Sequence, residues 1–158
     1  MSEEKCSRRG FLKAATLAVG AGVASPLLAS GNSTNKIGAL LDYPTKKVAS
    51  LRELKKNRQM SFNYPDENSP CQAVYINGKV KAYSILCTHK GCPTMYNEKE
   101  QTFDCPCHFS KFDAAKDGQM VIGQATGKLP EILVKVQGND IIAYGVDGLI
   151  YGRITNEL

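Results

Sequence analysis

The sequence predicts an all-β domain made of short strands. Apolar and polar residues alternate on both sides of Asn77-Gly78, the dipeptide most typical of a two-residue β-hairpin turn. Further short strand-like runs follow, separated by Gly-, Asn- and Asp-containing turns, and no long stretch of helical periodicity occurs after the first thirty residues. With 158 residues, the chain is long enough for one modest domain.

Residues 1–30 are predicted to be an export signal. Ser7-Arg8-Arg9-Gly10-Phe11-Leu12-Lys13 precedes an uncharged run over residues 14–29, which is shorter than the roughly 20 residues that span a bilayer. The paired arginines with Phe-Leu-Lys resemble the twin-arginine signal, which implies export of an already folded protein to the periplasm or another extracytoplasmic space. Since no clear Ala-x-Ala cleavage site follows, the signal is expected either to be cleaved or to stay as an N-terminal anchor, which would associate the protein with the membrane.

Positive charge is concentrated in the N-terminal third. Residues 1–58 carry 11 basic and 4 acidic side chains, whereas residues 59–158 carry 9 basic and 11 acidic ones. Because the globular part has no basic patch interleaved with aromatic residues, nucleic acid is excluded as a partner. We interpret residues 31–58 as a linker with a basic lead-in segment and residues 59–158 as the domain.

Six segments of this domain have the composition of β-strands. They are residues 72–76, 79–86, 102–104, 119–122, 132–137 and 141–144. Lys116-Asp117-Gly118 and Gly138-Asn139-Asp140 are predicted to form turns between them. The order of strands and turns indicates one all-β domain without internal repeats.

Both histidines of the chain lie beside cysteines in two short segments. These are Cys87-Thr88-His89-Lys90-Gly91-Cys92 and Cys105-Pro106-Cys107-His108-Phe109-Ser110. The spacing reads Cys-x-His, fifteen residues, Cys-x-x-His. Two thiolates and two imidazoles form a complete set of four metal ligands, so the sequence predicts a metal site. Two disulfides with two structural histidines would leave the placement of both histidines unexplained.

Zinc and iron are the metals weighed for this ligand set. Zinc is usually held by Cys-x₂₋₄-Cys and His-x₃₋₅-His pairs, whereas each segment here supplies one Cys and one His. This arrangement suits a two-iron cluster with cysteines on one iron and histidines on the other, and it resembles the Rieske [2Fe–2S] family. A zinc-bound structural or binding module is the alternative.

The resemblance implies a fold and a role for each of these residues. The implied fold is an antiparallel β-sandwich or barrel with a small two-loop cluster-binding subdomain at about residues 86–126. The implied roles are that Cys87 and Cys105 bind the buried iron, that His89 and His108 bind the exposed iron, and that Cys92 and Cys107 form a disulfide between the two loops. A disulfide fits an oxidising compartment, which the export signal predicts independently.

Four other residues complete this interpretation. Ser110 matches the family's serine that donates a hydrogen bond to a bridging sulfide. Phe112 stands where high-potential members carry a tyrosine that donates to a ligand sulfur, so a lower potential is implied. Cys6 lies in the signal, and Cys71 is predicted to be a buried small apolar residue at the start of a strand.

Residues 102–106, 109–113, 123–130 and 145–153 carry a narrower resemblance. They are similar to the small subunit of arsenite oxidase. This resemblance implies a non-catalytic electron-transfer subunit, with no catalytic residue of its own. Its partners would be a large subunit carrying a molybdenum–pterin centre and a second iron–sulfur cluster, and a c-type cytochrome or cupredoxin as acceptor. The Rieske subunit of a quinol-oxidising membrane complex is the alternative.

Overall fold

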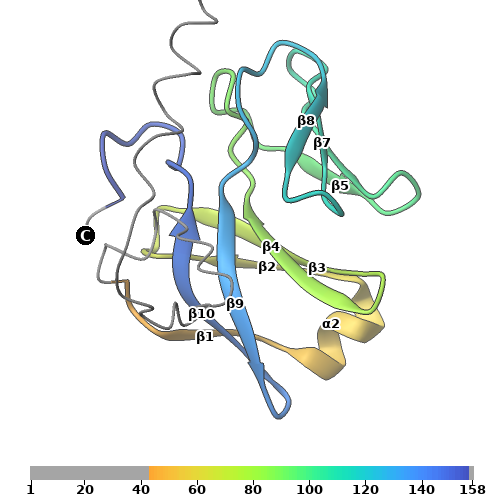
Figure 1. Cartoon of the computed structure of the whole chain (residues 1–158), viewed down its shortest axis with the longest axis vertical. Helices are drawn as coiled ribbons and strands as arrows, with labels where there is room; N and C mark the ends of the chain where they lie inside the picture. Colours follow the sequence, from red (N-terminus) through yellow and green to blue (C-terminus); the bar gives the residue numbers. More distant parts are fainter. Residues whose placement is uncertain (1–42, 157–158) are drawn as a thin grey trace, which may run out of the picture. The chain divides into compact units, whose positions relative to one another are not determined.

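The computed structural model describes residues 43–156, so the predicted export signal and residues 31–42 of the predicted linker lie outside the described residues. Residues 43–156 form ten β-strands and one short helix, arranged as two antiparallel sheets (Figure 1). The two antiparallel sheets confirm the predicted all-β antiparallel fold. Within residues 43–156, no helix has the length and apolar character needed to cross a membrane.

The larger sheet has six strands in the order β1-β10-β9-β4-β3-β2. Their bounds are β1 Lys46–Ser50, β2 Gln59–Asn63, β3 Pro70–Ile76, β4 Lys79–Ser84, β9 Glu131–Gln137 and β10 Asp140–Asp147. Strands β3 and β4 form the predicted hairpin, because Asn77 and Gly78 both take positive φ and Ile76 pairs with Lys79.

This sheet begins before residue 59, where the sequence placed the start of the domain. Strand β1 pairs with β10, and helix α2 (Leu51–Asn57) buries Leu54 completely. Lys46 and Lys47 of this segment lie on β1, at the edge of the sheet, and Lys55 and Lys56 lie in the last turn of α2, where their side chains are exposed. Ala49 and Leu54 point into the core instead.

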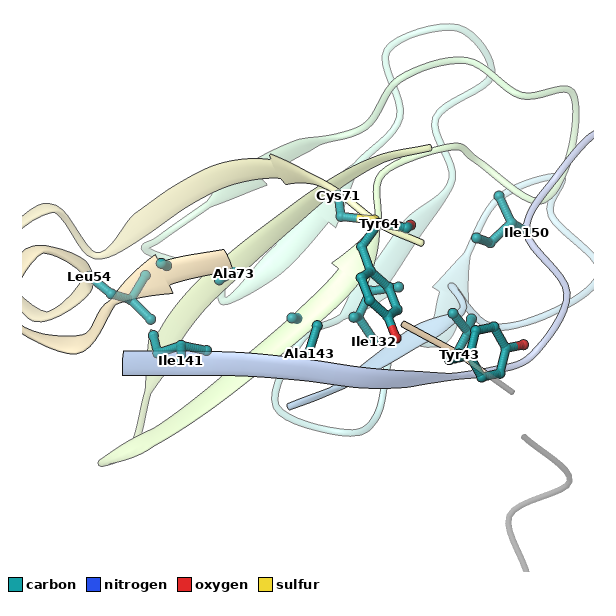
Figure 2. Packing of buried hydrophobic residues seen from close by; sticks show 12 residues of the cluster. Tyr43, Leu54, Tyr64, Cys71, Ala73, Ile132, Ile141, Ala143 and Ile150 are labelled. Atoms are coloured by element: carbon teal, nitrogen blue, oxygen red, sulfur yellow. The ribbon is translucent and has the colours of Figure 1, made fainter. Parts of the chain in front are cut away.

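The core of the larger sheet combines small and branched side chains, which Figure 2 shows converging from several strands and from α2. Cys71 belongs to this core and is 1% exposed. Its sulfur lies 3.3 Å from the carbonyl oxygens of Tyr64 and Ser69, and burial raises the pKa of its thiol to about 12. Cys71 is thus a buried apolar residue at the start of β3, as predicted, and not a reactive thiol.

The smaller sheet has four strands in the order β5-β6-β7-β8. Their bounds are β5 Met95–Asn97, β6 Thr102–Asp104, β7 Lys111–Asp113 and β8 Gln119–Ile122. One row across this sheet aligns Tyr96, Phe103, Phe112 and Met120. Phe103 and Phe112 are fully buried in a second core that also contains Cys87 and Cys105. Strands β6 and β8 match the predicted segments, whereas β5 and β7 were not predicted.

Candidate metal centre

Two loops carry the predicted ligands. The first loop, residues 86–93, connects β4 to β5, and the second loop, residues 105–110, connects β6 to β7. In the first loop the N–H of Cys87 donates to the carbonyl of Cys92 at 2.9 Å, and the N–H of Gly91 donates to the carbonyl of Cys87 at 2.8 Å. In the second loop the N–H of Cys105 donates to the carbonyl of Ser110 at 2.8 Å. Each loop is therefore a tight turn that presents one cysteine and one histidine.

A disulfide joins the two loops. The sulfurs of Cys92 and Cys107 are bonded, with 6.5 Å between the Cα atoms. The structure thus contains the pairing that the family resemblance implied. Because the loops have little core of their own, this bond holds their relative geometry.

The structure brings the four predicted ligand residues together. Cys87 and Cys105 are free thiols that are 1% and 2% exposed. The side chains of Cys87 and Cys105 are within hydrogen-bonding reach of each other. The rings of His89 and His108 lie with their centroids 4.5 Å apart, nearer the surface. The two sulfur donors are therefore buried, whereas the two imidazole rings lie nearer the surface.

One nitrogen of this group lacks a partner. Within residues 43–156, Nδ1 of His89 is buried and makes no hydrogen bond. A buried polar atom without a partner is unfavourable, and a metal ion would satisfy it. Two thiols and two imidazoles are also the donors that iron–sulfur chemistry uses. The residues present therefore fit a two-iron cluster.

A second cluster of cysteine sulfurs, different from the Cys87 and Cys105 pair, is excluded as a metal site. The sulfur atoms of Cys92, Cys105 and Cys107 lie within 4.8 Å of one another. Two of these sulfurs are bonded to each other in the disulfide, so Cys105 is the one member that can supply a thiolate.

The protonation of the predicted ligands follows from their surroundings. Burial raises the pKa of the Cys87 thiol and the Cys105 thiol raises it further, whereas hydrogen bonds from the His89 backbone and the Ser110 side chain lower it. Desolvation lowers the pKa of His89, and the charges of His108 and Lys90 act in the same direction. A neutral imidazole is the form that binds metal, and a bound cation would reverse the preference of Cys87 for its proton.

A third segment, residues 123–130 and called the third loop below, contacts both cluster loops. The N–H groups of Gln124 and Ala125 each donate to the hydroxyl of Ser110 at 3.0 Å. The hydroxyl of Thr88 donates to the carbonyl of Gly127 at 2.7 Å. The sequence analysis predicted a role for Ser110 but not for Thr88. The position of Thr88 between the predicted ligands Cys87 and His89 is the sequence feature that could have indicated it.

The C-terminal segment supports the first loop. Gly91 has φ +72°, and a Cβ atom at this position would lie 2.5 Å from the ring of Tyr151. The segment is anchored by Arg153, which pairs with Asp66 and donates to the hydroxyl of Ser69 at 2.7 Å. Sequence reasoning noted residues 145–153 as a resemblance but could not place Tyr151 against the first loop.

Comparisons with known proteins agree with this geometry. The family model for the Rieske [2Fe-2S] domain matches residues 45–137. Iodate reductase subunit IdrB of Denitromonas iodatirespirans is 37% identical over 171 residues, which cover 98% of this chain and 89% of the relative. The cytochrome bc1 complex Rieske iron-sulfur subunit of Corynebacterium glutamicum is 45% identical, over 66 residues that cover 41% of this chain and 16% of the relative.

A solved structure shares the fold. The soluble domain of the Rieske protein II (soxF) from Sulfolobus acidocaldarius aligns with a TM-score of 0.65 at 20% identity, covering 71% of this chain and 82% of that structure. The family match decides between the iron and zinc interpretations in favour of iron. This chain therefore belongs to the Rieske [2Fe–2S] family, as an electron-transfer subunit that carries a Rieske-type cluster.

Proposed function

We propose that this chain is the electron-transfer subunit of an arsenite oxidase, passing electrons from a large molybdopterin subunit to a c-type cytochrome or cupredoxin. The observation that carries the proposal is where the four arsenite-oxidase-like segments lie. Residues 102–106 and 109–113 form the second loop with its flanking strands, and residues 123–130 form the third loop. Residues 145–153 include Tyr151, which packs against Gly91. The resemblance therefore concerns the surroundings of the cluster.

In this proposal Cys87 and Cys105 bind the inner iron, and His89 and His108 bind the outer iron. The burial of both thiols and the unpartnered Nδ1 of His89 support these roles. When bound, the [2Fe–2S] cluster takes up and releases one electron at a time. Neutral imidazoles in place of two thiolates remove two negative charges and favour uptake of the electron. Phe112 supplies no hydroxyl, which keeps the potential below that of high-potential relatives.

Exposed apolar side chains near the histidines support a protein partner at this end of the molecule. Phe109, next to His108, is 79% exposed. Met95 and Ile122 are 62% and 61% exposed and lie in one register row across the smaller sheet, so they share a face. Exposed apolar patches of this kind mark interaction surfaces. We expect electrons to enter and leave at the exposed histidine edge.

We also propose an extracytoplasmic location. The Cys92–Cys107 disulfide supports it, because such bonds persist in oxidising compartments. The twin-arginine segment at Arg8 and Arg9 supports it from the sequence. Association with the membrane would require that this segment is retained.

A second candidate is the corresponding subunit of an iodate reductase, favoured by the IdrB relative that covers nearly the whole chain. The two candidates differ in the direction of electron flow. Arsenite oxidation releases electrons to this chain, whereas iodate reduction draws electrons from it. A quinol-oxidising complex is less favoured, since two cytochrome bc1 Rieske relatives match 54% and 41% of this chain, whereas the IdrB relative matches 98% of it.

The test uses the native complex isolated from its source. Molybdenum in a large co-purifying subunit is expected from mass spectrometry and metal analysis. Arsenite added to the oxidised complex should produce the paramagnetic signal of the reduced Rieske cluster. Loss of that signal when iodate is added to the reduced complex would assign the second candidate. A complex without molybdenum, or one that responds to neither oxyanion, would refute both.

A further inference from the structure

The hydroxyl of Ser110 is fully committed in its hydrogen bonding. A serine hydroxyl has one proton to donate and two lone pairs to accept with. The N–H groups of Gln124 and Ala125 each donate to this oxygen at 3.0 Å, which occupies both lone pairs. Ser110 is 0% exposed, so bulk water does not compete. The proton must therefore point away from the third loop.

The remaining direction leads to the predicted cluster ligands. The N–H of Cys105 donates to the carbonyl of Ser110 at 2.8 Å, and the Ser110 side chain lies within hydrogen-bonding reach of the Cys87 side chain. The hydroxyl proton is thus aimed at sulfur. Reduction adds a negative charge to a bound cluster, so a proton aimed this way stabilises the reduced form more than the oxidised form.

The third loop lies unusually close to Ser110. Gly123 has φ +113°, and a Cβ atom there would lie 2.3 Å from Cα and 2.7 Å from the hydroxyl oxygen of Ser110. Glycine is therefore required for this approach. At its other end the third loop is tied to the first cluster loop, because Thr88 donates to the carbonyl of Gly127 at 2.7 Å.

We propose that the third loop is a clamp that orients the Ser110 hydroxyl, and that Thr88 is a positioning residue that holds this clamp in place. The N–H groups of Gln124 and Ala125 occupy both lone pairs of the Ser110 oxygen, so the hydroxyl proton can point only away from the third loop. Thr88 lies on the first loop and Ser110 lies on the second, and the clamp couples them because each of the two side chains is hydrogen-bonded to the third loop. The proposal rests on the assignment of Cys87 as a cluster ligand.

The coupling is tested by a double-mutant cycle on the midpoint potential. The variants are Thr88→Val, Ser110→Ala and the double variant, each made in the full chain with the cluster assembled. Thr88→Val should lower the midpoint potential, because the third loop is no longer held and the Ser110 hydroxyl loses its fixed orientation. In the Ser110→Ala background the same substitution should cause no further shift. Thr88→Ser keeps a hydroxyl and should restore the wild-type potential.

Thr94→Val is the matched control. Thr94 also lies beside the first loop and donates its hydroxyl to a backbone carbonyl, that of Ile85, at 3.0 Å. This hydroxyl bonds to the residue that follows β4 and not to the third loop, so its removal should leave the potential unchanged. Equal shifts from Thr88→Val with and without Ser110 would overturn the proposal, as would an equal shift from Thr94→Val.

Pulsed paramagnetic resonance of the reduced wild-type cluster provides a second readout that needs no folded Thr88 variant. One exchangeable proton with a narrow hyperfine coupling, lost in Ser110→Ala, would support the fixed orientation. A broad distribution of couplings for that proton would contradict it. Neither readout depends on arsenite or iodate, so failure here is distinct from failure of the proposed function.

Discussion

Gly123→Ala is predicted to destabilise the cluster region strongly. Gly123 follows β8 directly and begins the third loop. Its φ of +113° lies in a region that side chains rarely adopt, and the new Cβ would lie 2.3 Å from Cα of Ser110. Since that neighbour is backbone of the second cluster loop, it cannot move aside without moving the predicted ligands.

Two terms set the size of the effect. The strained backbone costs on the order of 1–3 kcal/mol, and forcing an extra carbon into a packed region costs about 1–3 kcal/mol. The free energy of unfolding should therefore fall by roughly 2–6 kcal/mol. At about 4 °C per kcal/mol for a domain of this size, the melting temperature should drop by roughly 8–24 °C.

The assay is thermal loss of the visible absorption of the cluster, followed in parallel with far-ultraviolet circular dichroism. Gly127→Ala in the same loop is the matched control. A Cβ atom at Gly127 meets no atom within 4 Å, so its effect should be about 1 kcal/mol or less. A Gly123→Ala protein that melts within a few degrees of the wild type would show that the close approach of the third loop is not required.

Four further predictions concern the loops and their surface. His89→Ala should abolish the cluster, seen as loss of visible absorption and of the paramagnetic signal, since residues 43–156 contain no spare histidine. Intact-mass measurement should find Cys92 and Cys107 bonded, and Cys92→Ser should lower stability by about 2–4 kcal/mol; two alkylatable thiols in the untreated protein would refute the bond. Phe112→Tyr should raise the potential on the order of 40–100 mV in film voltammetry if its hydroxyl reaches a ligand sulfur, because only part of a hydrogen bond's energy differs between redox states. Phe109→Ser should weaken binding of the catalytic partner in a pull-down or calorimetric titration while leaving the potential unchanged.

The sequence by itself determined the features that depend on neighbouring residues. The Asn77-Gly78 turn is encoded in the two residues that tolerate positive φ, and the structure has it with the predicted strands on either side. Strands β6 and β8 also have the predicted bounds. The metal site was also evident locally, because each Cys–His pair lies within one short loop.

The tertiary structure alone decided how distant segments meet. The contact of Tyr151 with Gly91 joins positions sixty residues apart, and the bonds from the third loop to Ser110 join positions fourteen and fifteen apart. Strand β1 likewise looked like a lysine-rich lead-in until its pairing with β10 was known. Such contacts depend on how two sheets and three loops pack against one another, and this packing cannot be predicted from local dihedral preferences or residue spacing.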